Sequence, residues 1–255
     1  MKLSILTPIY NEAKTLQKVI DRLLAIEFPT DTEFVMVNDG SSDETAAILD
    51  AVTDPRVVVF HQPKNMGKGA AIRKAVEIAT GDYMIICDAD EEYRPQEIPL
   101  LMQPVLEGDA QVIYGTRTFG SHTSYSYWYV IGNKGVNLAA NILFNAYVSD
   151  VETCFKLMPL ELYRSLDVKA KGFGMEAEVT AKLLAAGYRP YEVPISYKAR
   201  TRAEGKKITA WDGVEALWIL FKVRVTKGSK RTPPPRIIVP SEAKASEANT
   251  EGDAA

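Results

Sequence analysis

The sequence is poor in the residue types that most often build redox and zinc sites. Its 255 residues include two cysteines, Cys87 and Cys154, and two histidines. Both cysteines lie in apolar stretches, so we expect buried, reduced thiols rather than a disulfide framework. His61 and His122 are far apart in the chain, and we interpret both as structural or surface residues. A histidine or cysteine metal site is therefore disfavoured.

Long apolar runs and a targeting leader are also missing. No run approaches the roughly 20 residues that cross a bilayer, so we expect a protein that can touch a membrane without spanning it. The first residues, MKLSILTPIYNE, pass directly into a strand pattern without the three parts of a signal peptide. We therefore expect a cytoplasmic protein, with any lipid contact at the cytoplasmic face of the membrane.

The overall charge excludes another class of partner. A formal net charge of -3 gives no global attraction to nucleic acid, which is not expected as a partner. With 46% apolar and 25% charged residues the chain is typical of a globular protein. We expect one folded domain over residues 1–226. Residues 227–255 contain a proline run and an Ala/Ser/Glu-rich tail, a composition that predicts disorder. Nothing in the sequence indicates an oligomeric state.

Short apolar runs alternate with segments of helical period in the first half of the chain. This pattern predicts an α/β fold with a mostly parallel sheet and helices on both faces. The predicted strands are residues 3–6, 34–37, 57–60 and 83–87. Ser41 and Glu44 have the spacing of a capping box before the second helix. The second half predicts a strand at 112–114, helices at 127–144 and 176–186, and a strand-like alternation over 191–197, which should cover the acceptor side of the cleft.

Polar motifs follow three of the predicted strands, at Thr7–Glu12, Asn38–Ser41 and Asp88–Asp90. Ligands of parallel sheets bind beyond the carboxyl ends of the strands, so we expect one shared cleft. Asp88 and Asp90 offer the oxygen ligands that Mg²⁺ or Mn²⁺ prefers when it also binds phosphates. Two acids in a turn usually form only a solvated loop. Their position after the buried run 83–87 favours a site.

Two further features of the first half suit a nucleotide. Asp39 could accept hydrogen bonds from a base or ribose, or it could only cap the following helix. Lys68, between Gly67 and Gly69 at a predicted helix N-terminus, could contact phosphate or ribose. The spacings of a P-loop and of the dinucleotide fingerprint are absent, which disfavours a nicotinamide oxidoreductase.

Basic and acidic candidates for the acceptor side lie in the second half. Arg117 and the segment 198–207, with Arg202 and Lys206, suit phosphate oxygens, although a solvated basic loop is the simpler explanation for any one of them. Asp150 is the first candidate for the general base that an acceptor hydroxyl needs. With a phosphate acceptor, Asp150 would only position it. The aromatic run 125–129 and the segment 211–224 could lie on lipid or pack inward.

At these motifs the sequence resembles glycosyltransferase family 2, within it the dolichyl-phosphate or polyprenyl-phosphate hexosyltransferase-like branch. The resemblance runs from Leu3 to about Leu217 and implies the GT-A fold, a Rossmann-like α/β sheet. The matching segments are TPIYNE, VNDGSSDET, NMGKGAAIRKAVEIATGDYMIICDADEEYRP, YGTR, SDVETCFKL, GFGMEAEVTAKLLAAGYRPYEVPISYKARTRAEGKKI and DGVEAL.

The resemblance also implies roles for individual residues. Asp150 and Asp90 would be catalytic, Arg117 would bind the acceptor, and Asp88 and Asp90 would hold the metal. Glu91 and Glu92 depart from the common family pattern, and we interpret Glu92 as an additional metal ligand. The implied donor contacts are Pro8, Tyr10, Glu12, Val37, Asp39, Lys68, Asp88, Ala89, Arg202 and Lys206.

The hypothesis from the sequence is an inverting transfer of glucose or mannose from a UDP- or GDP-linked sugar, with Mg²⁺ or Mn²⁺. The acceptor would be a polyprenyl phosphate, with a soluble or glycan acceptor as the alternative. A sugar nucleotidyltransferase is the nearest rival, but its glycine-rich first loop is missing from TPIYNE. A phosphatase should carry its acidic pair after the first strand. A catalytically silent module that binds a nucleotide sugar is the alternative from a different class.

Overall fold

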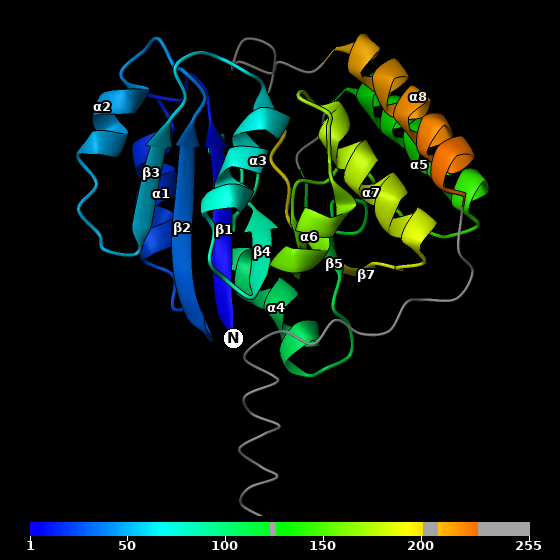
Figure 1. Ribbon diagram of the computed structural model, residues 1–255, viewed down its shortest axis with the longest axis horizontal. Helices are drawn as coiled ribbons and strands as arrows, with labels where there is room; N and C mark the ends of the chain where they lie inside the picture. The colour runs from blue at the N-terminus through cyan, green and yellow to red at the C-terminus, as the bar shows by residue number, and fades with distance from the viewer. Residues whose placement is uncertain (123–125, 201–208, 229–255) are drawn as a thin grey trace, which may run out of the picture.

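The computed structural model describes residues 1–122, 126–200 and 209–228. At its centre is a seven-stranded sheet in the order β3-β2-β1-β4-β6-β5-β7 (Figure 1). The strands are β1 (Lys2–Ile9), β2 (Asp31–Asn38), β3 (Val57–His61), β4 (Tyr83–Ile86), β5 (Ile113–Thr116), β6 (Lys156–Pro159) and β7 (Tyr191–Pro194). The helices are α1 (Leu16–Leu24), α2 (Thr45–Asp50), α3 (Lys68–Ile78), the short 3-10 helix η1 (Pro95–Glu97), α4 (Ile98–Leu106), α5 (Tyr127–Phe144), α6 (Leu160–Leu166), α7 (Gly174–Ala186) and α8 (Ala210–Lys227).

The sheet is parallel except at one strand. β1 pairs in parallel with β2 and β4, β2 with β3, and β5 with β7. β6 runs antiparallel to both β4 and β5. Helices cover both faces, with α3 and α7 in front of the strands in Figure 1 and α1 behind them. The predicted α/β architecture with a mostly parallel sheet is therefore confirmed.

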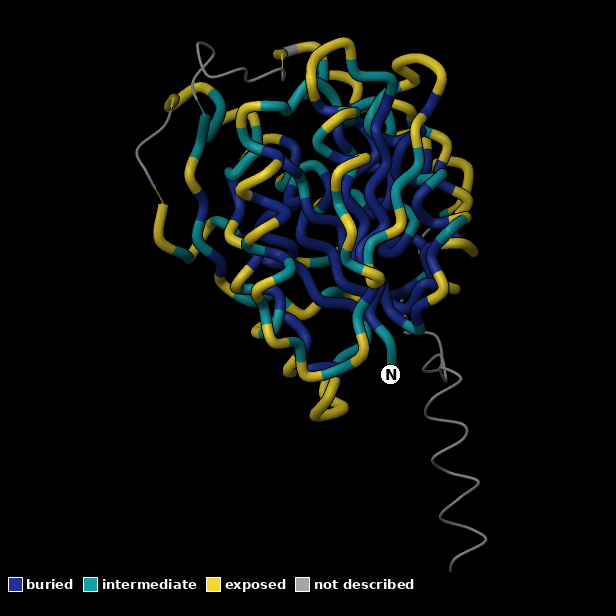
Figure 2. Tube along the Cα trace, turned by 90° about the vertical axis from the view of Figure 1, so that its left-hand side faces the viewer, coloured by how far each residue is buried: buried dark blue, intermediate teal, exposed yellow. Residues whose placement is uncertain are grey.

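The central strands carry continuous apolar runs because both of their faces are covered. The side chains of Phe34–Val37 in β2 and Met84–Ile86 in β4 are fully buried. Figure 2 shows the buried residues gathered in the interior, with exposed residues mainly around the outside. The core thus fixes the strands, and their carboxyl ends emerge together at one edge.

Some local features differ from the sequence predictions. The capping box of Ser41 and Glu44 does not form. Instead, Ser41 Oγ accepts a hydrogen bond from the Asn11 N–H, and Asp43 accepts one from the Thr45 N–H at the start of α2. The helices α4 and α6 were not expected. Cys87 and Cys154 are buried free thiols, as predicted. Of the predicted disordered tail over residues 227–255, Lys227 is the last residue of α8, and residues 229–255 lie outside the described residues.

A buried carboxylate ties β1, β2 and the loop before β4 together at the other end of the sheet. Glu33 accepts hydrogen bonds from Lys2 Nζ at 2.5 Å, from Ser4 Oγ at 2.6 Å and from the Thr80 N–H at 2.6 Å. Burial opposes ionisation of Glu33, but these donors outweigh it and lower the pKa to about 2. The charged Glu33 side chain therefore stabilises the fold at every pH at which it remains ionised.

We predict that Glu33→Gln destabilises the protein by about 1–3 kcal/mol near neutral pH, because the buried donors lose a charged acceptor. The pKa of Glu33 is lower in the folded state than in the unfolded state. The stabilisation is therefore complete above the unfolded pKa of about 4.5 and is lost as the pH falls toward about 2. Urea unfolding of both proteins from pH 7 to pH 2.5 measures this. An undiminished difference at the acid end would contradict the assignment.

Candidate active site

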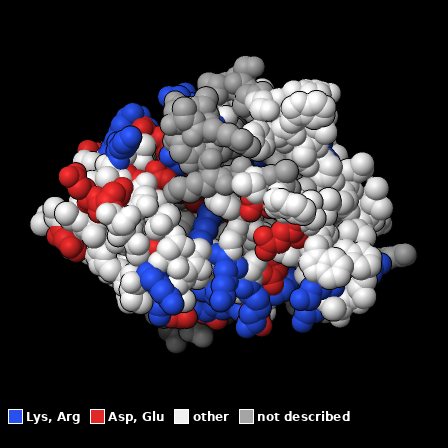
Figure 3. All heavy atoms as spheres, turned by 90° about the horizontal axis from the view of Figure 1, so that it is seen from above, with Lys and Arg blue, Asp and Glu red and all other residues white. Residues whose placement is uncertain are grey.

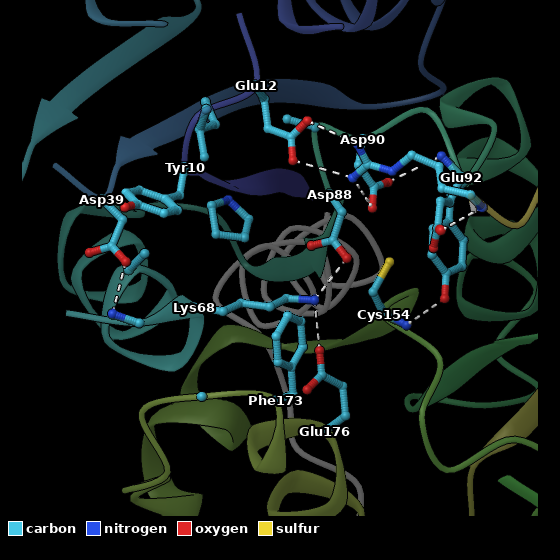
Figure 4. Close-up of a pocket in the computed structure, with 18 of the residues that line it drawn as sticks. Tyr10, Glu12, Asp39, Lys68, Asp88, Asp90, Glu92, Cys154, Phe173 and Glu176 are labelled. Atoms are coloured by element: carbon cyan, nitrogen blue, oxygen red, sulfur yellow. Dashed lines mark hydrogen bonds and ion pairs between the residues drawn. The ribbon is translucent and has the colours of Figure 1, made fainter. Parts of the chain in front are cut away.

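A cavity of about 320 Å³ opens at the carboxyl ends of β1, β2 and β4. The polar residues that follow these strands converge there because parallel strands end at the same edge of the sheet. Figure 4 shows Tyr10 and Asp39 on one side of Asp88, and Cys154 on the other. The three motifs that the sequence placed in one cleft do meet in one pocket.

Asp88 and Asp90 directly follow the buried end of β4, and each is paired with a cation from elsewhere in the chain. Lys68 Nζ lies 2.7 Å from Asp88 Oδ2, and Arg200 lies 2.9 Å from Asp90 Oδ2. Arg200 also contacts Glu12 at 3.1 Å. These ion pairs join the turn after β4 to α3, to the loop after β1 and to the segment after β7 (Figure 4).

The charge balance of this acidic pair suits a bound cation. Burial and the neighbouring charge of Asp88 raise the pKa of Asp90, and Arg200 only partly offsets them. No group of three or more His, Cys, Asp or Glu side chains among the described residues is arranged to hold a metal. Two carboxylates completed by substrate phosphates are a common Mg²⁺ arrangement. The donor set therefore fits a divalent ion that is held jointly with a diphosphate.

Glu92, the predicted additional metal ligand, accepts a hydrogen bond on each of its carboxylate oxygens. Its Oε2 accepts a hydrogen bond from the Tyr197 hydroxyl at 2.6 Å, and its Oε1 accepts one from the Arg200 N–H at 2.8 Å. Both oxygens are thus used to fix the segment that carries Arg200. Glu92 thus supports the segment that carries Arg200 and also lines the pocket, and its role as an additional metal ligand stays a prediction.

Asp39 organises the loop that leads into α3. Its Oδ1 accepts hydrogen bonds from Gln62 Nε2 at 2.7 Å and the Met66 N–H at 2.8 Å, and its Oδ2 accepts one from the Gly67 N–H at 2.8 Å. The sequence allowed Asp39 to cap the helix that directly follows it. The structure shows that its hydrogen bonds go to the loop before the next helix, while the residue still lines the pocket.

The other predicted donor contacts divide into three groups. Pro8, Tyr10, Glu12, Lys68 and Ala89 line the pocket. Val37 is fully buried in β2 and is not among the described lining residues, so its donor contact stays a prediction. Arg202 and Lys206 lie outside the described residues.

Arg117 and Asp150 form a buried, two-point ion pair. Arg117 Nε donates to Asp150 Oδ2 at 2.7 Å, and its Nη2 donates to Oδ1 at 2.7 Å. Burial disfavours the charge of Asp150, but Arg117 outweighs this and lowers the pKa of the carboxyl. Arg117 lines the pocket, whereas Asp150 is absent from its described lining. The lowered pKa and the two hydrogen-bonded oxygens fit a residue that positions Arg117, and the catalytic role of Asp150 stays a prediction.

The structure adds pocket residues that the sequence left without a role. Glu176, in the first turn of α7, forms an ion pair with Lys68 Nζ at 2.7 Å, so Lys68 bridges Asp88 and Glu176. Glu152 and Cys154, on the loop before β6, also line the pocket. Glu176 is one of several acids in its helix, and no spacing rule distinguishes the one that faces Lys68. Only the packing of α7 reveals it.

Comparisons with known proteins point to one family. The sequence profile described as "Glycosyl transferase family 2" matches residues 4–166. The chain is 30% identical over 177 residues to the glycosyltransferase GlyG of Streptococcus pneumoniae, covering 64% of this chain and 58% of that protein. It is 25% identical over 247 residues to the undecaprenyl-phosphate mannosyltransferase of Micrococcus luteus, covering 88% of this chain and 99% of that protein. The chain spans only 58% and 34% of the lengths of GlyG and of the Haloferax volcanii relative AglD.

Solved structures share the fold at low identity. Glucosyl-3-phosphoglycerate synthase from Mycobacterium tuberculosis, crystallised with Mn²⁺, UDP and glucosyl-3-phosphoglycerate, aligns with a TM-score of 0.67 at 18% identity over 91% of this chain and 81% of that one. Staphylococcus aureus TarS in complex with UDP-GlcNAc aligns with a TM-score of 0.61 at 16% identity over 91% of this chain and 68% of that one. These likenesses establish the GT-A fold of the chain.

The buried Arg117–Asp150 pair generates a testable prediction. Asp150→Asn leaves a buried guanidinium without its counter-charge and should destabilise the protein by about 3–5 kcal/mol. The double variant Arg117→Met/Asp150→Asn should lose less, because no buried charge is then left unpaired. Urea unfolding measures the stability of both variants. The control is Glu161→Gln, which removes one partner of an exposed ion pair and should change the stability little. A double variant less stable than Asp150→Asn alone would contradict the prediction.

Proposed function

Because the chain belongs to glycosyl transferase family 2 and is a glycosyltransferase, we propose that it transfers a hexose from a nucleoside diphosphate sugar to a polyprenyl phosphate or a related acceptor. The observation that carries the proposal is the position of Asp88 and Asp90 inside the pocket, beside residues that can receive a nucleoside. The hexose is glucose or mannose, the nucleotide UDP or GDP, and the anomeric carbon is inverted.

In this proposal the nucleoside occupies the side of the pocket formed by Pro8, Tyr10 and Asp39. Tyr10 offers an aromatic surface for a base, and the hydrogen bonds of Asp39 hold the Met66 and Gly67 backbone in place. Lys68 follows Gly67 as the first residue of α3 and points to Asp88. The diphosphate would therefore lie between the start of α3 and the turn after β4, where backbone N–H groups and a cation favour an anion.

Asp88 and Asp90 would hold Mg²⁺ or Mn²⁺ together with the diphosphate. When bound, such an ion supplies neutralisation of the charge that develops on the leaving diphosphate. Lys68 and Arg200 are already at hydrogen-bond distance from the two carboxylates and orient them. The acceptor oxygen would attack the anomeric carbon from the side of Arg117, which Asp150 holds at the pocket wall.

An exposed apolar face supports an acceptor that resides in a lipid layer. α8 packs on α7 and α5 through Ala216, Leu220 and Val223. Its opposite side exposes Trp211, Trp218 and Phe221, and α5 exposes Tyr127, Trp128, Leu138 and Ile142. The surface on the right of Figure 3, over these helices, carries few charges. Aromatic residues next to basic ones such as Lys222 and Lys227 are typical of a helix that lies in a membrane interface.

No described helix combines the length and apolar character that a bilayer crossing requires. We therefore propose contact through the surface of α5 and α8. The undecaprenyl-phosphate mannosyltransferase relative, matched over 99% of its length, supports a polyprenyl phosphate as acceptor. A soluble or glycan acceptor, or a module that binds the nucleotide sugar without transfer, remains the alternative.

Replacing Asp90 by Ala should abolish sugar transfer while leaving the fold intact, because the diphosphate loses half of its proposed metal site. The measurement is nucleoside diphosphate release from UDP-glucose and GDP-mannose with Mn²⁺ and polyprenyl phosphate, with circular dichroism as the check of the fold. The exposed variant Asp109→Ala serves as a matched control and should keep full activity. Turnover near the wild-type rate in Asp90→Ala would count decisively against the proposal. A wild-type protein that binds a nucleotide sugar but never turns over would support the silent module.

Trp218→Ser/Phe221→Ser should weaken binding to vesicles of phosphatidylglycerol and phosphatidylcholine by about tenfold or more, because two exposed aromatic anchors are lost. Substitution is preferable to removal of α8, whose inner face is part of the core. Val58→Ser on β3, an exposed apolar residue on the far edge of the sheet, is the control. Equal co-sedimentation of all three proteins would show that α8 is not the lipid contact.

A further inference from the structure

Two carboxylate oxygens of the pocket have no hydrogen-bond donor among residues 1–122, 126–200 and 209–228. Oε1 of Glu152 and Oε2 of Glu176 are buried from solvent, and no hydrogen bond reaches either atom from the described part of the chain. Both side chains line the pocket. A buried acceptor without a partner costs free energy, so native proteins rarely retain one unless a ligand supplies the donor. These two oxygens therefore mark a place where a ligand group fits.

The surroundings of Glu152 decide the charge of that group. The charged groups that face it are Glu176 from α7, Lys156 from β6, Arg117 after β5, and Asp150. Lys156 Nζ donates to the carbonyl oxygens of Val151 at 2.8 Å and Thr153 at 2.5 Å, and Arg117 is paired with Asp150.

The nearby cations are therefore engaged elsewhere, and burial together with Glu176 raises the pKa of Glu152. A second anion would be repelled at this place. An uncharged group with several hydroxyl donors suits it.

The position of the pair along the pocket identifies such a group. Figure 4 shows Tyr10 and Asp39 on one side of Asp88, and Cys154 on the opposite side, with Glu176 across Lys68. Glu152 lies two residues before Cys154 on the same loop. In the proposed function the nucleoside lies at Tyr10 and Asp39 and the diphosphate at Asp88. The next part of the donor, beyond the diphosphate, is the hexose.

We propose that Glu152, with Glu176 beside it, accepts hydrogen bonds from the hydroxyl groups of the transferred hexose and so selects the sugar. This inference rests on the proposed function. Lys68 joins the sugar side to the diphosphate side, because its Nζ contacts both Glu176 and Asp88 at 2.7 Å. Hydrogen bonds from hydroxyls to a carboxylate are short and strong. A site built to receive a hydroxyl rejects a sugar that places that hydroxyl elsewhere.

The test separates affinity for the nucleotide from affinity for the sugar. Titration calorimetry with Mn²⁺ measures binding of UDP, GDP, UDP-glucose and GDP-mannose to the full chain, to Glu152→Gln and to Glu152→Ala. Binding of the nucleoside diphosphate should change less than about twofold. Binding of the preferred nucleotide sugar should weaken by about 10- to 100-fold in Glu152→Ala. Glu161→Gln, an exposed change on α6, should bind like the wild type.

A stability measurement guards against a merely structural role. Oε1 of Glu152 has no donor within the described part of the chain, so Glu152→Gln, which keeps the shape and removes the charge, should unfold at the wild-type temperature or higher. A residue that only supports the fold would lower that temperature and weaken both ligands alike, which would overturn the inference.

The remaining outcomes are distinct. If the variants bind the nucleotide sugar as the wild type does and only turnover falls, Glu152 acts on the acceptor and the inference is overturned. If the wild type binds neither nucleoside diphosphates nor nucleotide sugars, the proposed function fails and the inference fails with it. If the wild type binds both ligand classes and Glu152→Ala matches it in binding and turnover, only the inference fails.

Discussion

The structure depends on holding like-charged carboxylates close together at the edge of a buried sheet. Asp88 and Asp90 follow β4 directly, and the apolar strand behind them leaves their charges little solvent on that side. Mutual repulsion and burial would drive such a pair apart or protonate it unless cations came near. Lys68 and Arg200 meet that need from elements far apart in the chain. The acidic pair thereby gathers the loop after β1, the start of α3 and the segment after β7 around one pocket.

The two halves of the molecule contribute different sides of this pocket. The parallel strands β1 to β4 and their loops supply the surface on which we place the nucleoside. The antiparallel strand β6 reverses the chain and brings residues 150–156 to the opposite wall, where α7 adds Glu176. Lys68 contacts a carboxylate from each half, Asp88 and Glu176.

The carboxylates around the pocket are of two kinds, those whose oxygens are all hydrogen-bonded and those that keep an oxygen without a described donor. Asp150 and Glu92 have both oxygens engaged, by Arg117 and by Tyr197 with the Arg200 backbone. These two carboxylates support the pocket walls that carry Arg117 and Arg200. Glu152 and Glu176 each keep a buried oxygen without a described donor, at a cost in stability that a purely structural site would not retain. The contrast between satisfied and unsatisfied carboxylates is what distinguishes supporting residues from candidate ligand contacts here.

The sequence by itself determined the elements whose signals are local. The alternation of apolar runs and helical periods predicted β1 to β4 with their helices and the full extent of α5, and the strand ends predicted that Asp39, Asp88 and Asp90 share a cleft. What only the tertiary structure decided were contacts between distant segments. The partner of Asp150, the two donors to Glu92 and the approach of Glu152 and Glu176 to Lys68 and Asp88 depend on how β6, α7 and the segment after β7 pack beside β4. Periodicity along a chain reports which face of an element is apolar, but the pairing of charges is fixed by packing between elements, which leaves no local signal in the sequence.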